Sequence, residues 1–196
     1  MIAVIDNGGA NWASLLAALQ RLGGETRVTQ DAATIRQASH VILPGVGAAA
    51  EAMARLRATG LDRLLPALSQ PVLGICLGMQ LLFGTSEEGP SECLGLLPGR
   101  VARLQPAPAL RVPHTGWSRV NWRAPHPLAA QFDGKSWFYF MHGYAVLESP
   151  DTLATADAGT GFAAVVARGN LTGVQFHPER SGAAGARLLQ NFLTLR

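Results

Sequence analysis

The stretch that most constrains this chain is PVLGICLGMQLLF at residues 71–83, an apolar run that crosses a tight turn between two glycines. Its first part has strand character, and the apolar residues after the turn recur at helical spacing. A strand that turns abruptly into a helix crowds the backbone on both sides of the turn, and Gly74 and Gly78 lack the Cβ that would clash. The pattern predicts a nucleophile elbow with Cys76 at the carboxyl edge of a sheet, where a helix N-terminus favours the thiolate.

A buried structural thiol is the common role of a free cysteine, so the elbow alone leaves two interpretations of Cys76 open. Two other stretches favour a reactive cysteine. They are LPGVG at 43–47 and GVQFHPERS at 173–181. Together with the elbow, they make Cys76 a candidate nucleophile.

Length and composition bound the class of protein. At 196 residues the chain is long enough for one domain, predicted to span residues 1–196. No uninterrupted apolar run reaches about 18 residues, and the start MIAVID lacks the features of a signal peptide, so we expect a cytoplasmic protein without a membrane partner. Its two cysteines are not expected to form a disulfide there. A net charge of +3, with only 15% charged residues spread along the chain, argues against a nucleic-acid partner.

The N-terminal part alternates short apolar strands with helical patterns. Strands are expected at 2–6, 26–29, 40–43 and 72–75, and helices at 48–56 and where Leu15, Leu16, Leu19 and Leu22 recur. This order is typical of a parallel sheet covered by helices on both faces. Ligands of such sheets bind at the carboxyl ends of the strands, where the loops 7–11 and 44–47 fall beside Cys76. The Gly8-Gly9 pair lacks the motif of a phosphate loop, so a structural turn is the better interpretation.

The rest of the chain shows many short strand patterns broken by turns such as Arg168-Gly169-Asn170. After a loop at 84–90, strands are expected at 99–104, 119–122, 136–140, 144–147, 152–156, 163–168 and 171–176, and a helix at 185–195. The predicted fold class is an open α/β sheet, mostly parallel and flanked by helices, with added antiparallel strands in the C-terminal half.

His177 and Glu179 would supply what a thiol nucleophile needs. A base must take the thiol proton and return it to the leaving group, and a third group must orient that base. The two residues are two positions apart at the end of an expected extended run, so their side chains would emerge on the same face. A surface turn is the alternative, and a metal site is disfavoured because the other histidines lack ligand spacing. We predict a triad of Cys76, His177 and Glu179, and no metal.

Acyl transfer also needs hydrogen-bond donors aimed at the developing oxyanion. The N–H of Leu77, directly after the nucleophile, is one candidate by elbow geometry. The N–H of Val46 is a second, because Gly45 and Gly47 on either side would allow its peptide to rotate. A simple tight turn is the alternative for this glycine pair.

These stretches resemble the triad, or class I, glutamine amidotransferases, in GICLGMQ at 74–80 and GVQFHPE at 173–179. Within that superfamily, the chain is similar to the glutaminase subunits of imidazole glycerol phosphate synthase in PGVG at 44–47, PHTGW at 113–117, FYFMHGY at 138–144 and ERS at 179–181. The similarity runs from Ile2 to Leu195. It implies a flavodoxin-like amidotransferase fold.

The resemblance implies hydrolysis of glutamine to glutamate and ammonia through a thioester on Cys76, without a cofactor. It also implies a partner, a separate (β/α)₈-barrel synthase subunit that uses the ammonia to form imidazole glycerol phosphate and an aminoimidazole carboxamide ribotide in histidine biosynthesis. The implied glutamine pocket consists of Gly45, Gly47, Gln80, Glu88, His142, Gly143 and Tyr144. The implied partner face consists of Asn7, Asn11, Trp117, Tyr139 and Arg180, with core packing as the alternative for Trp117.

The chain departs from the family pattern at a few positions. The loop 7–11, Thr115 and Ser118 differ where the partner would dock, and Gly143 lacks a hydroxyl near the substrate. Two other functions share part of the pattern: a glutaminase of another pathway, such as anthranilate or pyridoxal phosphate synthesis, and a subunit that has lost activity. The motifs after residue 112 disfavour the first, and the intact triad residues disfavour the second.

Overall fold

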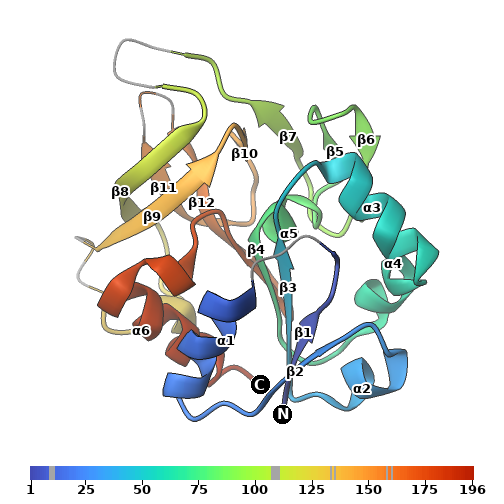
Figure 1. The fold of residues 1–196 in the computed structure, drawn as a ribbon. Helices are drawn as coiled ribbons and strands as arrows, with labels where there is room; N and C mark the ends of the chain where they lie inside the picture. The colour runs from blue at the N-terminus through green and yellow to red at the C-terminus, as the bar shows by residue number, and fades with distance from the viewer. Residues whose placement is uncertain (9–11, 107–110, 133, 135, 158, 160) are drawn as a thin grey trace.

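The structure is a computed structural model that describes residues 1–8, 12–106, 111–132, 134, 136–157, 159 and 161–196 (Figure 1). The strands are β1 (Ile2–Ile5), β2 (Thr26–Thr29), β3 (His40–Gly45), β4 (Val72–Cys76), β5 (Thr85–Ser86), β6 (Ser91–Glu92), β7 (Arg100–Arg103), β8 (His114–Trp122), β9 (Trp137–His142), β10 (Tyr144–Val146), β11 (Thr152–Asp157), β12 (Gly161–Arg168) and β13 (Leu171–Val174). The helices are α1 (Trp12–Arg21), α2 (Ala32–Gln37), α3 (Ala49–Ala58), α4 (Leu61–Leu64), α5 (Leu77–Gln80) and α6 (Gly182–Phe192), with 3₁₀ turns η1 (Leu65–Ala67), η2 (Pro127–Ala129) and η3 (Pro178–Arg180).

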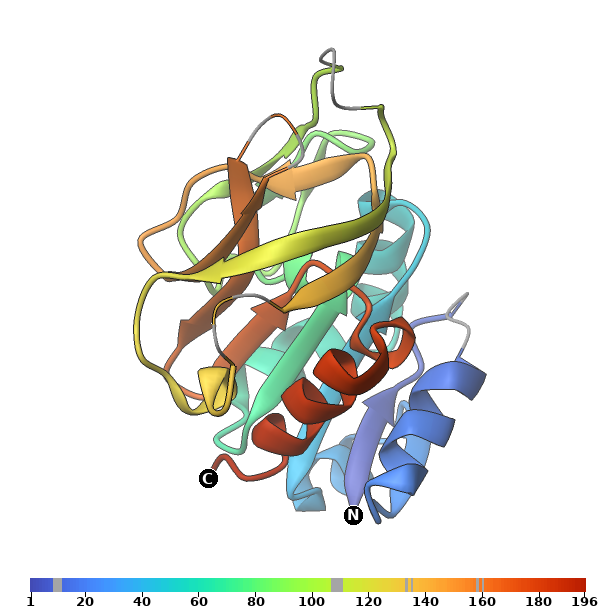
Figure 2. The same cartoon turned by 90° about the vertical axis from the view of Figure 1, so that its left-hand side faces the viewer.

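The main sheet has the strand order β2-β1-β3-β4-β13-β12-β11-β8-β9, and its first five strands run parallel. Side chains of one strand alternate between two cores: Ile2 and Val4 pack on the side of α1 and α6, whereas Ala3 and Ile5 pack on the side of α2 and α3. Figure 2 shows α1 and α6 on the near side of the strands. Burial on both faces confirms the predicted parallel sheet between helices.

The sheet continues beyond β13 in antiparallel strands, with β9 at its edge. The turn Gly169–Asn170 joins β12 to β13, and Gly169 adopts the positive φ of +57° that such a two-residue turn favours. The predicted antiparallel strands of the C-terminal half are therefore confirmed. A smaller sheet, in the order β10-β7-β5-β6, covers a third core around Phe83.

Several predicted boundaries were wrong because tertiary contacts decide them. Strand β8 begins at His114 and not at 119, since its first residues pair with β9, from His114 with His142 to Arg119 with Trp137. The predicted loop at 84–90 contains β5, which pairs with both β6 and β7. The last helix ends at Phe192, and the following residues form i+3 turns in which Leu195 still packs on the core.

Two short helices were missing from the prediction, although chain connectivity could have indicated one. Strands β2 and β3 both run parallel to β1, so the chain between them must cross over the sheet, and α2 makes that crossing. Asp31 caps it, because its side chain accepts a hydrogen bond of 2.7 Å from the Thr34 amide. Helix α4 follows α3 after Gly60.

Helix α5 is a single turn, shorter than the predicted helix that runs to Phe83. The carbonyl oxygens of Leu81, Leu82 and Phe83 accept hydrogen bonds from the amides of residues 94–97. The amides of Leu82 and Phe83 donate to the Met79 and Gln80 oxygens, three residues back and not four, so the α-helix gives way to a tighter turn before Phe83. None of the helices in the described ranges is long and apolar enough to cross a membrane.

Candidate active site

Cys76 lies at the junction of β4 and α5 with φ +54° and ψ −111°, a conformation that few non-glycine residues adopt. The two flanking glycines explain how the turn fits. A Cβ on Gly78 would lie 1.8 Å from the Leu43 carbonyl oxygen, and one on Gly74 would lie 2.6 Å from the Gly78 oxygen. The predicted strand–turn–helix at Cys76 is thus confirmed.

The short α5 weakens one part of the sequence argument. A macrodipole is the sum of aligned peptide dipoles, and a helix of Leu77–Gln80 offers only one turn of them. Support for a thiolate must therefore come largely from side chains near the Cys76 sulfur.

His177 and Glu179 lie side by side at the 3₁₀ turn η3. His177 Nδ1 lies 2.9 Å from Glu179 Oε1, and both side chains are almost fully buried. The turn brings the two together, so the predicted pairing is confirmed but the expected extended backbone was wrong: strand β13 ends at Val174.

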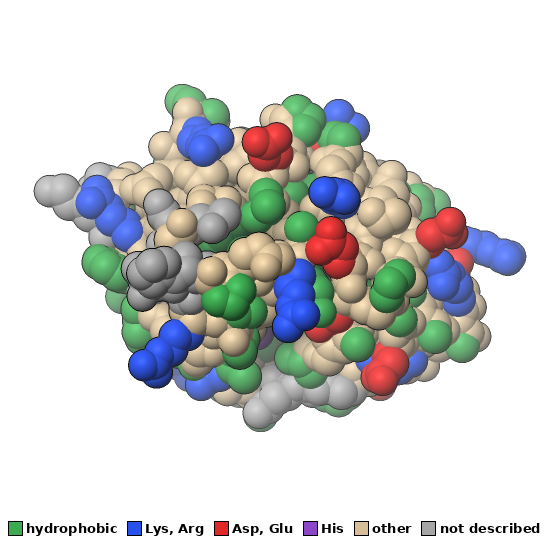
Figure 3. All heavy atoms as spheres, turned by 90° about the horizontal axis from the view of Figure 1, so that it is seen from above, with side chains coloured by type: hydrophobic (Ala, Val, Ile, Leu, Met, Phe, Trp, Pro, Cys, Tyr) green, Lys and Arg blue, Asp and Glu red, His purple; other side chains and the backbone are tan. Residues whose placement is uncertain are grey.

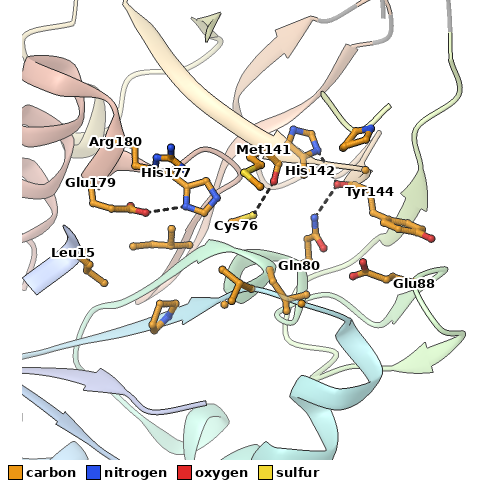
Figure 4. A pocket seen from close by; sticks show the side chains of 18 of the residues that line it. Leu15, Cys76, Gln80, Glu88, Met141, His142, Tyr144, His177, Glu179 and Arg180 are labelled. Atoms are coloured by element: carbon orange, nitrogen blue, oxygen red, sulfur yellow. Dashed lines mark hydrogen bonds and ion pairs between the residues drawn. The ribbon is translucent and has the colours of Figure 1, made fainter. Parts of the chain in front are cut away.

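The environment of His177 favours its cation. Burial acts against the charge, but hydrogen bonds and electrostatic attraction to Cys76 and Glu179 outweigh it and raise the pKa of His177 to about 10. Because the Glu179 contact uses Nδ1, it leaves Nε2 for the sulfur of Cys76 (Figure 4).

Strand β9 holds the turn η3 in place. The His177 amide donates to the Tyr139 carbonyl oxygen at 2.9 Å, and the Tyr139 amide donates to Ser181 Oγ at 3.0 Å. Ser181 Oγ in turn donates to the His177 carbonyl oxygen at 2.6 Å. The sequence prediction gave no role to Ser181, which is buried and fixes the backbone of the histidine.

Two polar groups besides the histidine contact the Cys76 sulfur. The thiol donates to the Met141 carbonyl oxygen at 3.9 Å, and Gln175 Nε2 donates to the sulfur at 3.7 Å. Gln175 Oε1 accepts from Gln80 Nε2 at 3.0 Å, and Gln80 Nε2 also donates to the Tyr144 carbonyl oxygen at 2.8 Å. Sequence reasoning missed Gln175, although it lies inside the motif GVQFHPE.

Cys76, Gln80, Met141 and Tyr144 line a pocket of about 670 Å³, large enough for a small polar ligand, and Gln175 is buried behind its wall. Figure 4 shows the labelled side chains converging on it from several strands. The pocket brings together the predicted triad, oxyanion and glutamine-pocket residues, and also Arg180, in the list Gly45, Val46, Gly47, Cys76, Leu77, Gln80, Glu88, His142, Gly143, Tyr144, His177, Glu179 and Arg180. The sequence prediction did not include Met141, which contributes its carbonyl oxygen.

The two glycines beside Val46 differ in how much space surrounds them. A Cβ on Gly45 would lie 2.8 Å from the Gly78 nitrogen, because β3 pairs with β4 at Gly45 and Cys76. Gly47 has φ +91° and open space around it. The Val46 N–H belongs to the Gly45–Val46 peptide, and Gly45 has no room for a side chain, so a glycine is required where that peptide would rotate. The rotation itself stays a prediction.

Burial shifts the pKa values of two ionisable residues that line the pocket, Glu88 and His142. Burial raises the pKa of Glu88, partly offset by a hydrogen bond from the Ala49 backbone. Burial and the neighbouring His114 lower the pKa of His142 to about 3, so its ring is neutral at neutral pH. The His142 ring contacts the Tyr144 carbonyl oxygen through Nδ1 at 2.9 Å, which places the single ring proton on Nδ1.

Two predicted partner residues, Trp117 and Tyr139, lie on β8 and β9, and Arg180 of η3 lies beside them while also lining the pocket. Trp117 packs edge-on against Tyr139 at 6.1 Å, and the Arg180 guanidinium lies 4.5 Å from the Tyr139 ring centre. Trp117 is 51% exposed, which excludes the core alternative. Asn7 is buried, with its carbonyl oxygen bonded to Arg55, and Asn11 lies outside the described residues.

Within the described ranges, no three His, Cys, Asp or Glu side chains are grouped so that they could hold a metal ion. Seen from above, basic and acidic side chains lie among hydrophobic ones on the same face (Figure 3).

Comparison with known proteins agrees with this geometry. Residues 3–195 match the family model of class I glutamine amidotransferases. A solved glutamine amidotransferase covers 98% of this chain and 96% of its own with a TM-score of 0.76 at 20% identity. PurLQS from Thermotoga maritima covers 98% and 96% with a TM-score of 0.69 at 21% identity. The chain belongs to the class I glutamine amidotransferases.

Curated relatives narrow the family. Imidazole glycerol phosphate synthase subunit HisH of Xanthomonas oryzae pv. oryzae (strain MAFF 311018) is 54% identical over 99% of this chain and 97% of its own length. HisH of Xylella fastidiosa (strain Temecula1 / ATCC 700964) is 54% identical with the same coverage. Within the amidotransferases, this chain is a member of the HisH family.

Proposed function

We propose that this chain is the glutaminase subunit of an imidazole glycerol phosphate synthase, acting in the cytoplasm in histidine biosynthesis and using Cys76, His177 and Glu179 as its triad. The observation that carries the proposal is the buried His177–Glu179 pair, 2.9 Å apart, beside a cysteine held in an elbow conformation. The 54% identity to a HisH protein over 99% of this chain supports the assignment to histidine biosynthesis.

The reaction follows from these positions. The Cys76 thiolate attacks the side-chain amide carbon of glutamine, and the tetrahedral intermediate collapses when His177 gives its proton to the departing nitrogen, which leaves as ammonia. Glutamate is then bound as a thioester. A water molecule gives a proton to His177 and attacks the thioester carbon, and the sulfur leaves as thiolate. Glu179 keeps the imidazole oriented and compensates its charge throughout.

Two sets of polar groups would recognise the substrate. The N–H groups of Val46 and Leu77 are the proposed donors to the oxyanion, since both residues line the pocket at the elbow. Both N–H groups of Gln80 donate to protein acceptors, so Gln80 Oε1 remains free to accept a hydrogen bond from the substrate. The Glu88 side chain lies nearby (Figure 4). An acceptor and a carboxylate suit the α-ammonium group of glutamine. The remaining proposed pocket residues, Gly45, Gly47, His142, Gly143 and Tyr144, complete the wall.

The proposed partner is a (β/α)₈-barrel subunit that receives the ammonia and forms imidazole glycerol phosphate and the aminoimidazole carboxamide ribotide. The exposed Trp117 packs against the half-buried Tyr139, with Arg180 above the tyrosine ring, and this cluster supports docking on the face of β8 and β9. Large aromatic residues and arginine are enriched among residues that dominate binding energy. Asn11 remains in the proposed partner face, whereas Asn7 is buried and would support the loop 7–11 from inside.

The test uses the complex with the barrel subunit encoded in the same genome. The Cys76→Ala complex should lose synthesis from glutamine and keep synthesis from ammonium salts, because only the thiolate step is removed. A glutamine-like alkylator, 6-diazo-5-oxonorleucine, should add one label to the wild-type chain, at Cys76. Persistent glutamine-dependent turnover in Cys76→Ala would sink the assignment, and loss of both activities would point to failed assembly.

A further inference from the structure

Gln175 is a buried polar residue whose role is unexplained by the triad. It lies directly after β13 and two positions before His177, and its side chain is fully buried. A buried amide needs partners at both ends, since each unsatisfied polar atom carries a desolvation cost. Both ends of this amide have partners, and one of them is the Cys76 sulfur, 3.7 Å from Nε2.

A chain of hydrogen bonds sets the direction of the amide. The Tyr144 carbonyl oxygen can only accept, so it fixes the amide nitrogen of Gln80, which donates to it at 2.8 Å. The same nitrogen donates to Gln175 Oε1 at 3.0 Å. With its oxygen held there, Gln175 presents its nitrogen to the sulfur. Through Gln80 and then Gln175, the Tyr144 carbonyl oxygen therefore determines that an N–H group faces the Cys76 sulfur.

We propose that Gln175 is a further catalytic residue, which donates Nε2–H to the Cys76 thiolate and, through Oε1, fixes the amide of Gln80 that faces the substrate. The proposal rests on the proposed role of Cys76 as the nucleophile.

The chemistry explains why such a donor is useful. The thiol donates its own proton to the Met141 carbonyl oxygen at 3.9 Å, an interaction that is lost when the thiolate forms. A thiolate accepts hydrogen bonds, and bonds to charged groups are stronger than bonds to neutral ones. The α5 helix supplies only one turn of peptide dipoles. An amide N–H fills this need without exchanging protons, so it does not compete with His177 for the role of base.

The same donor acts again later in the reaction. When the thioester forms, the sulfur loses its negative charge and its bond to Gln175 weakens. When water has attacked, the sulfur leaves as thiolate, and a donor already in place stabilises that leaving group at no cost of reorganisation.

The experiment measures alkylation of Cys76 by iodoacetamide against pH in the complex with the barrel subunit. Iodoacetamide is small and neutral, so its rate reports the thiolate without recognition of glutamine. Peptide mass mapping separates Cys76 from the second free cysteine, Cys93. Gln175→Met removes the donor and keeps the length of the side chain. Gln80→Met leaves the Gln175 N–H in place but removes the donor that holds Gln175 Oε1, and Gln37→Met at an exposed helical position is the surface control.

In Gln175→Met, we expect the pH midpoint of alkylation to rise by about one unit and the rate below the midpoint to fall about tenfold, the effect of one hydrogen bond to a charged group. Gln80→Met should raise the midpoint by less than Gln175→Met does, because the Gln175 N–H stays but loses the partner that orients it, and should also raise the KM for glutamine. Gln37→Met should change neither.

An unshifted profile in folded Gln175→Met would overturn the proposal, and so would an equal shift in Gln80→Met, which would indicate general packing of the pocket. If Gln175→Met does not fold, Gln175→Leu gives the same test, because it removes the N–H beside the sulfur without adding a charge, and it should also raise the midpoint. If Cys76→Ala keeps glutamine-dependent turnover, the proposed function itself fails, which is a separate result.

Discussion

The two halves of the main sheet solve opposite problems. In the parallel half, the strands inside the edge strand β2 are buried on both faces, and neighbouring backbones are so close that a Cβ on Gly78 would lie 1.8 Å from an oxygen of β3. In the antiparallel half, β8 and β9 present Trp117, Trp137 and Met141 to the surface, each more than half exposed. Tight packing can hold a strained nucleophile, whereas an exposed apolar face can bind a partner. The comparison predicts chemistry in one half and docking in the other.

The largest expected effect comes from the residues that end the parallel half. His177→Ala should lower glutamine-dependent turnover about 10⁶-fold and Glu179→Gln about 10⁴-fold, by analogy with a protease triad, because orienting a base contributes less than being one. Ammonium-dependent synthesis by the complex is the control and should be unchanged. Equal losses in the two variants would contradict the distinction between base and orienting group.

The next largest expected effect is on stability, which should respond differently to a glycine substitution in each half. Gly78→Ala inserts a Cβ against backbone and should lower the free energy of unfolding by about 3 kcal/mol or more. Gly161→Ala, at the start of β12 in the antiparallel half, meets no atom within 4 Å and should change it by less than about 0.5 kcal/mol. Chemical denaturation of both variants measures the difference. A tolerated Gly78→Ala would show that the elbow can relax.

The oxyanion donor gives a smaller, purely kinetic effect. Val46→Pro removes the Val46 N–H and should hold glutaminase activity in the complex about 10²–10³-fold below wild type. Thermal unfolding checks that the half-exposed loop tolerates proline. The free subunit should already be slow if this N–H turns toward the site only when the partner is bound, and high activity in the free subunit would contradict that idea.

The pH dependence of stability should have opposite signs at two histidines. The pKa of His177 is raised to about 10, so its stabilising contribution is complete below the ordinary value of 6.5 and is lost as the pH rises through about 10. The pKa of His142 is lowered to about 3, so stability is lost as the pH falls from 6.5 toward 3. The melting temperature should therefore change less with pH on the alkaline side in His177→Gln, and less on the acid side in His142→Gln. Unchanged profiles would contradict these shifts.

The smallest expected effects lie on the docking face. Trp117→Ala should weaken binding of the barrel subunit by about 2 kcal/mol and Arg180→Ala by about 1 kcal/mol, with little change in thermal stability because both are partly exposed. Trp122, at the other end of β8, provides the contrast. Its ring stacks on Phe132 with ring centres 5.7 Å apart, so Trp122→Ala should lower thermal stability instead of affinity. Calorimetric titration with the barrel subunit measures the affinities. Wild-type affinity and coupling in Trp117→Ala would exclude it from the interface.

The sequence allowed most of the parallel half to be predicted, because its signals are local. Apolar runs, glycines around Cys76 and the spacing of His177 and Glu179 each carry their meaning within a few residues. Parallel strands buried on both faces also have strongly apolar sequences, which are easy to recognise.

The remaining features depend on contacts between distant segments. Strand β8 begins at His114 because β9 pairs with it, and the residues that follow α5 bond to the distant segment 94–97. Gln175 could be found only when its distance to Cys76 was known, since nothing in a lone glutamine indicates which atom it will face. Buried polar partners are the part of a site that sequence patterns hide best.

Strand β9 has one more consequence, for the solubility of the chain. It is the last strand of the main sheet, and an open edge invites another strand to pair with it and start aggregation. Here the outward backbone groups of Tyr139 are taken by Ser181 and His177, and the Met141 carbonyl oxygen by the Cys76 thiol. The contacts that position the candidate catalytic groups therefore also cap the edge, so variants that loosen the turn after β13 should be prone to aggregate as well as inactive.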